Sequence, residues 1–155
     1  MEKFEIVGLG GTFDRLHSGH KLFLDIASHY GKVVHIGLIS PSYLSKIRKK
    51  SAKNIQTYQE RQKNVESHLL KRNVSSRITK IDSPGMDRAL AADSNLSALV
   101  VSQETYPGAT AINDQRHHDK KPKVTIIVIP CVIRANGTLE SSTRLRMEES
   151  DKNLS

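Results

Sequence analysis

The sequence predicts a doubly wound α/β domain, with about five parallel strands and helices on both faces of the sheet. Strand-like runs alternate with helix-like segments along the chain. The strand runs are continuously apolar and rich in β-branched residues, which is typical of strands buried on both faces. A chain of 155 residues can build one domain with a real core but is too short for two. We therefore expect one domain over 1–155, with frayed last residues.

Five apolar runs are the predicted strands, over 4–9, 32–40, 76–82, 98–102 and 123–130. A helix is predicted over 19–30, where apolar residues recur at helical spacing and Gly31 is a natural stop. Its inward face is expected to contain Leu22, Phe23, Ile26, Ala27 and Tyr30.

Thr57 and Glu60 have the spacing of a capping box, which predicts a helix from there to about Arg72 with Tyr58, Val65 and Leu69 inward. The segment 41–56 has no clear period and is interpreted as a long basic loop with some helix. Further helices are expected over 86–92, 110–118 and 142–150, and 103–109 is expected to be a loop.

Unusual loops follow every predicted strand. They cover 10–17, 40–56, 83–86, 102–109 and 130–141. In doubly wound sheets, ligands collect at the carboxyl ends of the strands. The loops are therefore expected to form one site.

Composition narrows the class of protein and of partner. Apolar content of 37% and charged content of 26% are those of an ordinary globular protein, and no apolar run approaches membrane-spanning length. The amino terminus lacks the pattern of a secretory signal, and the single Cys131 excludes an internal disulfide, so we expect a cytoplasmic protein.

A net charge of +8 calls for an anionic partner: nucleic acid, a membrane surface or a phosphorylated substrate. Four Tyr, three Phe and no Trp supply few stacking platforms for single-stranded nucleic acid.

The segment GGTFDRLHSGH, residues 10–20, joins the first strand to the first helix. Glycines at 10 and 11 allow a ligand to approach the backbone closely. A helix that begins near Ser18 directs its free amides and the positive end of its dipole at the loop, which favours an anion such as phosphate. Thr12 can add a hydroxyl donor, and His17 and His20 can face the same pocket.

Several known motifs do not fit this segment. No Gly-Lys-Ser/Thr follows the glycines, so it is not a P-loop, and Phe13 interrupts the dinucleotide fingerprint. A zinc site would need more ligands at ligand spacing than the sequence offers. Two merely structural histidines at a helix start remain an alternative.

GGTFDRLHSGH resembles the Thr/His-x-Gly-His signature of the nucleotidylyltransferase superfamily. ESSTRLR, residues 140–146, resembles its second signature, with Glu140 in place of the usual Ile. VVSQETYPGATAINDQR (100–116) and the YQERQKNVESHL helix resemble archaeal and eukaryotic phosphopantetheine adenylyltransferases. The resemblance covers about residues 3–147. It implies a Rossmann-like sheet and an enzyme of coenzyme A biosynthesis that transfers the adenylyl group of ATP to 4'-phosphopantetheine, with release of pyrophosphate.

The resemblance also implies roles for residues near the first loop. His20 would stabilise the transition state, with His17 donating to the triphosphate beside it. Thr12 would contact the acceptor phosphate, and the backbone of Gly11 to Phe13 would line the nucleotide. Lys46 would hold the acceptor phosphate, with Lys49 or Lys50 as alternatives. Mg²⁺ would be held by the ATP phosphates and water rather than by protein ligands.

Other residues match the family along the rest of the chain. Glu104 would lie on the ribose or adenine side. Ser141, Ser142, Thr143 and Arg146 would bind the β- and γ-phosphates at a helix start. Asn113 and Arg116 match the family without a distinct role, and a surface salt bridge is the alternative for Arg116. Asp14 is expected to brace the loop.

Two other functions stay open from the sequence. A sister nucleotidylyltransferase could use another phosphorylated acceptor, such as nicotinamide mononucleotide. A nucleic-acid-binding module would suit the charge but leave both signatures unexplained. We expect neither nucleic acid nor a membrane to be a partner. The oligomeric state stays open between a monomer and a small homo-oligomer.

Overall fold

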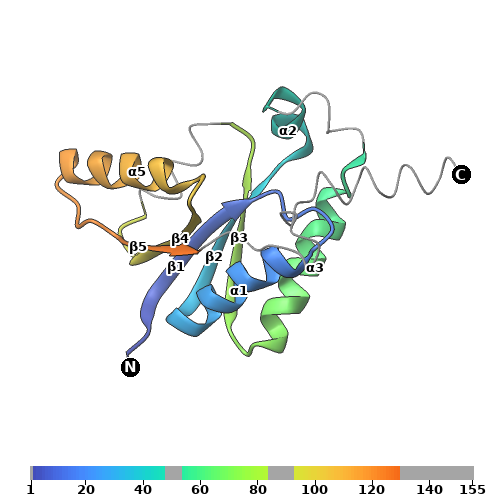
Figure 1. Ribbon diagram of the computed structural model, residues 1–155, viewed down its shortest axis with the longest axis horizontal. Helices are drawn as coiled ribbons and strands as arrows, with labels where there is room; N and C mark the ends of the chain where they lie inside the picture. Colours follow the sequence, from blue (N-terminus) through green and yellow to red (C-terminus); the bar gives the residue numbers. More distant parts are fainter. Residues whose placement is uncertain (1, 48–53, 84–92, 130–155) are drawn as a thin grey trace, which may run out of the picture.

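The computed structural model describes residues 2–47, 54–83 and 93–129 (Figure 1). Its sheet contains five parallel strands in the order β3-β2-β1-β4-β5. The strands are β1 (Phe4–Gly11), β2 (Gly31–Ile39), β3 (Ser75–Ile81), β4 (Ala98–Ser102) and β5 (Thr125–Ile129). The predicted all-parallel, doubly wound class is confirmed, and the order reverses direction at β1, which places the loop after β1 at the centre of the carboxyl edge.

Helices cover both faces of this sheet. They are α1 (Ser18–Tyr30), α2 (Pro41–Ile47), α3 (Tyr58–Lys71) and α5 (Tyr106–His118). Helices α1 and α3 lie side by side over one face, and α5 lies over the β4–β5 end on the other face (Figure 1). The short helix α2 follows β2 beyond the carboxyl edge of the sheet.

Alternate residues of the central strand enter two separate hydrophobic clusters. Val7 and Leu9 pack with α1 and α3 in the larger cluster, whereas Ile6 packs with Ala109 of α5 in the smaller one. All three β1 side chains are almost fully buried. Burial on both faces explains why this strand reads as a continuous apolar run rather than an alternating one.

Helix α1 is buried over a wider face than predicted. Ala27 is fully buried as expected, and the other four predicted residues are partly buried against the core. Leu24, which the prediction left out, is also fully buried. The reason is that α1 packs on the sheet with one face and on α3 with the adjoining face, where Asp25 accepts hydrogen bonds from His68 and Arg72.

The segment 41–56, predicted to be a loop with some helix, contains the helix α2 over its first seven residues. One element boundary was predicted wrongly, because α5 begins at Tyr106 instead of 110. Pro107 sits in the first turn of α5, where its missing N–H costs no hydrogen bond, so the Pro-Gly pair does not mark a loop here. The helices expected over 86–92 and 142–150, and Cys131, lie outside the described residues. Within the described ranges, no helix is long and apolar enough to cross a membrane.

Candidate active site

The loop between β1 and α1 folds tightly at the carboxyl edge of the sheet. Phe13 and Arg15 have φ angles of 53° and 47°, in the left-handed region that non-glycine residues rarely adopt. The Phe13 ring turns back under the loop, where a Cβ on Gly11 would lie only 3.2 Å from the ring. A side chain at position 11 would crowd the Phe13 ring, and glycine avoids this contact.

His17 and His20 together cap the amino end of α1, because the side chain of each accepts a hydrogen bond from the backbone N–H of the other. Nδ1 of His17 accepts hydrogen bonds from the backbone N–H groups of Gly19 (3.0 Å) and His20 (3.4 Å). Nδ1 of His20 accepts one from the backbone N–H of His17 at 3.5 Å. The two rings stack with centroids 3.7 Å apart. Because Nδ1 is the acceptor in both rings, the neutral form of each histidine has its proton on Nε2 and is a hydrogen-bond donor there.

His20 is uncharged at neutral pH. Burial is the main cause that lowers its pKa to about 3, and the charge of His17 lowers it further while Asp14 opposes the shift. A neutral imidazole can donate a hydrogen bond to charge that develops on a phosphate without bringing a buried ion into the resting site. The site therefore combines an oriented Nε2–H donor with the positive end of a helix dipole.

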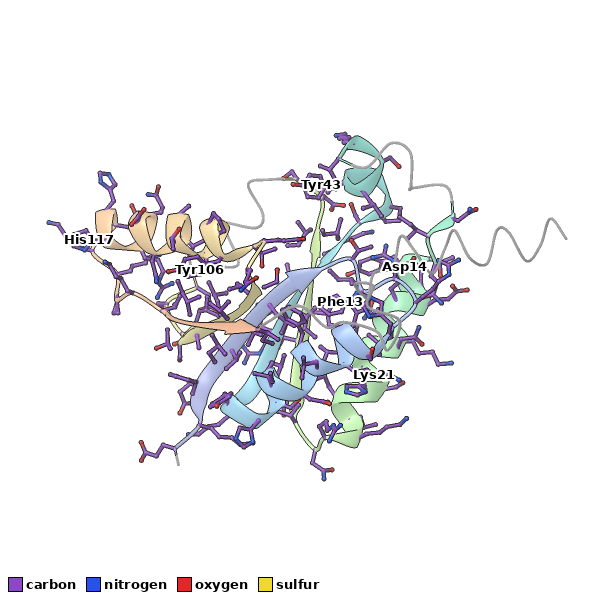
Figure 2. The ribbon with its side chains drawn as sticks, in the orientation of Figure 1. Phe13, Asp14, Lys21, Tyr43, Tyr106 and His117 are labelled. Atoms are coloured by element: carbon purple, nitrogen blue, oxygen red, sulfur yellow. The ribbon has the colours of Figure 1, made fainter. Side chains whose placement is uncertain are left out.

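Asp14 braces the loop from below, as expected. Its side chain is fully buried, and its Oδ1 accepts from the backbone N–H of Gln56 at 2.8 Å. The Gln56 side chain in turn accepts from the backbone N–H of Arg15 at 2.8 Å, and Nη1 of Arg15 donates to Oδ2 of Asp14 at 2.7 Å. The three residues form a closed set of contacts, here called the loop brace, that fixes the strained backbone at Arg15. Figure 2 labels Phe13 and Asp14 close to the start of α1.

Arg61 is the structural residue that the sequence interpretation missed. Its side chain is fully buried on α3, and Nη1 donates to the carbonyls of Thr12 (2.9 Å) and Ile39 (2.8 Å), while Nε donates to the carbonyl of Gln56 (3.1 Å). The signal was available, because position 61 belongs to the same helical stripe as the predicted inward residues Tyr58, Val65 and Leu69. Burial lowers the pKa of Arg61, and the nearby Asp14 raises it.

The structure brings some predicted site residues to this edge. Thr12 lies at the end of β1, Lys46 is exposed in the last turn of α2 after β2, and Glu104 is exposed in the turn after β4. Lys49 and Lys50, together with Ser141, Ser142, Thr143 and Arg146, lie outside the described residues. Among the described residues, no three His, Cys, Asp or Glu side chains gather as metal ligands.

Two predicted site residues are not brought to this edge. The Asn113 amide exchanges hydrogen bonds with the backbone of Val124 at 2.9 and 2.8 Å. Arg116 is buried, not on the surface, and donates to the carbonyls of Pro122 (2.7 Å) and Asp93 (3.1 Å). These partners precede β5 and β4, so both side chains hold α5 to the opposite, amino-terminal edge of the sheet.

The chain is similar in sequence to a known family and to enzymes of known activity. The cytidylyltransferase-like family model matches residues 9–148. The chain is 34% identical over 148 residues to the phosphopantetheine adenylyltransferase of Methanopyrus kandleri, which covers 96% of this chain and 92% of that protein. It is 39% identical over 148 residues to the phosphopantetheine adenylyltransferase of Pyrococcus abyssi, with 94% and 91% covered.

Solved structures share the fold. A protein of unknown function from Archaeoglobus fulgidus superposes with a TM-score of 0.65 at 32% identity, over 79% of this chain and 87% of that one. Pantoate-beta-alanine ligase from Francisella tularensis superposes with a TM-score of 0.60 at 14% identity, over 98% of this chain and 71% of that one. At that identity the second likeness concerns the fold alone.

Replacing Arg61 with Met is expected to destabilise the protein by about 3 kcal/mol, because three partly buried hydrogen bonds to carbonyls are lost at about 1 kcal/mol each. Urea denaturation measures the change. Arg72→Met is the matched control at the end of the same helix, where a half-exposed guanidinium pairs with Asp25 and is worth at most about 1 kcal/mol. Equal losses in the two variants would contradict the role given to Arg61.

Proposed function

Because the chain belongs to the cytidylyltransferase-like family, and within it to the phosphopantetheine adenylyltransferases, we propose that it transfers the adenylyl group of ATP to 4'-phosphopantetheine. The products are dephospho-coenzyme A and pyrophosphate. The observation that supports this most directly is the pair of mutually capped histidines at the start of α1, in a chain matched over nearly its whole length by enzymes of this activity.

The reaction needs positioning and charge stabilisation rather than a base. The attacking atom is an oxygen of the acceptor phosphate, which is already an anion at pH 7. It forms a bond to the α-phosphorus of ATP while the bond from that phosphorus to the bridging oxygen of pyrophosphate breaks. Negative charge grows on the departing pyrophosphate and the oxygens around the α-phosphorus, where fixed donors lower the barrier.

The two histidines suit this demand. In our proposal, Nε2–H of His20 donates to the reacting phosphate, and Nε2–H of His17 donates to the triphosphate beside it. Their mutual capping fixes both tautomers, so no reorientation is needed when charge develops. The low pKa of His20 keeps the ring a neutral donor over the whole physiological range.

The remaining contacts are assigned by position along the carboxyl edge. Thr12 and Lys46 follow β1 and β2 and would hold the acceptor phosphate, while the backbone of Gly11 to Phe13 and the exposed Glu104 would contact the nucleoside. The segment 141–146, outside the described residues, is assigned to the β- and γ-phosphates by its resemblance to the family signature and not by its position. Asn113 and Arg116 would act from the opposite edge, by holding α5 in place.

Enzymes of this family commonly use a divalent metal, and we propose Mg²⁺. Asp14, the carboxylate of the catalytic loop, is fully buried and accepts from Gln56 and Arg15, so it is not available as a ligand. Mg²⁺ would therefore enter on the phosphates of ATP and complete its shell with water. It would neutralise charge on the triphosphate.

The proposal is tested by incubating the protein with ATP, Mg²⁺ and a panel of phosphorylated acceptors while pyrophosphate is measured. Pyrophosphate should appear with 4'-phosphopantetheine. Release with nicotinamide mononucleotide but not with phosphopantetheine would leave only the superfamily assignment. Retention of nucleic acid without any pyrophosphate release would indicate a binding module instead.

His20→Ala is expected to lower kcat by about a hundred- to a thousandfold, because one preorganised donor to the transition state is lost. The Kd for ATP, measured by calorimetry, should change by less than about fivefold, since a donor used in the transition state contributes less to the ground state. His29→Ala, at the exposed far end of the same helix, is the control and should turn over at the parent rate. Turnover of His20→Ala within a few-fold of the parent would make His20 a structural cap only.

Lys46→Ala is expected to raise the KM for phosphopantetheine by about ten- to a hundredfold and to leave the KM for ATP nearly unchanged, because one charge-assisted contact to the acceptor phosphate is lost. Steady-state kinetics with each substrate varied in turn measure the split. Lys49→Ala and Lys50→Ala examine the two neighbouring lysines. Equal, small effects at all three positions would mean that the acceptor phosphate is held elsewhere.

A further inference from the structure

An open groove lies beside the loop between β1 and α1, between α1 and α3. Its volume is about 480 Å³, within the range of small-molecule sites. The two helices run side by side in Figure 1, and Figure 2 labels Lys21 in the first turn of α1. The lining side chains that concern us are Arg15, Lys21, Gln56, Asn64, Ser67 and Lys71, here called the α1–α3 groove. His17 and His20 do not line it.

The groove contains positive charge that the neighbouring carboxylates do not neutralise. None of the described residues that line it carries a carboxylate. The nearest acidic residue of α1, Asp25, is engaged by His68 and Arg72, and Asp14 is engaged by Arg15. Within the described part of the chain, no carboxylate forms an ion pair with Lys21 or Lys71. Two ammonium groups that line one cavity without counter-charges favour an anion there.

The polar lining suits a phosphorylated ligand in particular. Asn64, Ser67 and Lys71 are three and four residues apart on α3 and so lie along one face of the helix. They offer an amide, a hydroxyl and an ammonium group, which can donate to phosphate oxygens or bind ligand hydroxyls. The groove is open to solvent, and its limited volume matches a small molecule better than the extended backbone of a nucleic acid.

The groove also adjoins the catalytic loop through two members of the loop brace. Arg15 lines the groove and donates to Asp14, and Gln56 lines it and holds the backbone of Arg15 at 2.8 Å. The Arg15 side chain is 19% exposed and is already held in place by Asp14. An ordered cation loses little conformational freedom when it binds an anion.

We propose that the α1–α3 groove binds a small phosphorylated anion, at a site separate from the one at which His17 and His20 act. The ligand contacts Lys21 and Lys71 from the two helices and Arg15 from the loop. This site does not depend on which acceptor the enzyme uses.

Inorganic tripolyphosphate, titrated into the full chain by calorimetry, is the probe. The parent protein should bind it at two sites, the catalytic one and the groove. Lys71→Glu should weaken the groove site by about tenfold or more, because one contact is lost and a repulsive charge is introduced. Lys63→Glu, an exposed lysine on the same helix outside the groove, is the matched control and should keep both sites. A negative charge at the carboxyl end of α3 could destabilise the helix, so Lys71→Gln is a second variant that removes the lysine without adding this charge. It should also weaken tripolyphosphate binding at the groove.

Amide resonances of Asn64 and Ser67 should shift on titration of the parent protein and stay unchanged in Lys71→Glu. All these variants should keep the parent's turnover of ATP and phosphopantetheine, so failure of the groove site is distinguishable from failure of the proposed activity. Equal tripolyphosphate binding in Lys71→Glu and Lys63→Glu would overturn the proposal. The proposal would also be overturned if the protein bound a single-stranded oligonucleotide but not tripolyphosphate, and if Lys71→Glu and Lys63→Glu weakened oligonucleotide binding equally.

Discussion

The buried guanidinium of Arg61 is the contact on which the catalytic edge depends. Parallel strands end with carbonyls that the sheet no longer satisfies, and a ligand site needs irregular backbone at that edge. One side chain donates to carbonyls that follow β1, end β2 and precede α3, and so joins three segments that are distant in the sequence. Asp14 and the Tyr58 ring, 5.6 Å from the guanidinium carbon, partly offset the cost of burying its charge.

The loop between β1 and α1 is held by several local contacts, none of which would be enough alone. Two left-handed residues in a row of three would be unstable in a free loop, because each costs about 1–3 kcal/mol. The loop brace, the Phe13 ring under Gly11 and the cap of α1 offset that cost by fixing the same few residues from different sides. The cap of α1 fixes the direction of the two histidine rings, as our proposal of a transition-state donor requires.

Local patterns in the sequence predicted the features that local forces decide. The five strands and the glycine-rich turn follow from apolar runs and from glycines at fixed positions, and both were predicted. Leu24 was missed because α1 also packs on α3, which the pattern of α1 alone does not show. Arg61 was missed although it lies on the inward stripe of its helix, because a charged side chain is rarely fully buried. Asn113 and Arg116 were matched by motif, but a motif does not say at which edge of the sheet a helix residue lies. That edge is decided by the direction in which α5 runs back over the sheet.

The excess of positive charge serves two different purposes in this fold. Arg61 and Arg116 are both buried, and their planar, multi-donor groups hold backbone carbonyls that lie on separate segments. Lysines, whose ammonium is compact and strongly hydrated, are found instead on the surface beside the carboxyl edge and between α1 and α3. A net charge of +8 therefore overstates the attraction for anions, because part of it stabilises the scaffold. In our proposals, the charge that remains for ligands is defined by the positions of the lysines and of the two histidine donors, rather than by the net charge of the chain.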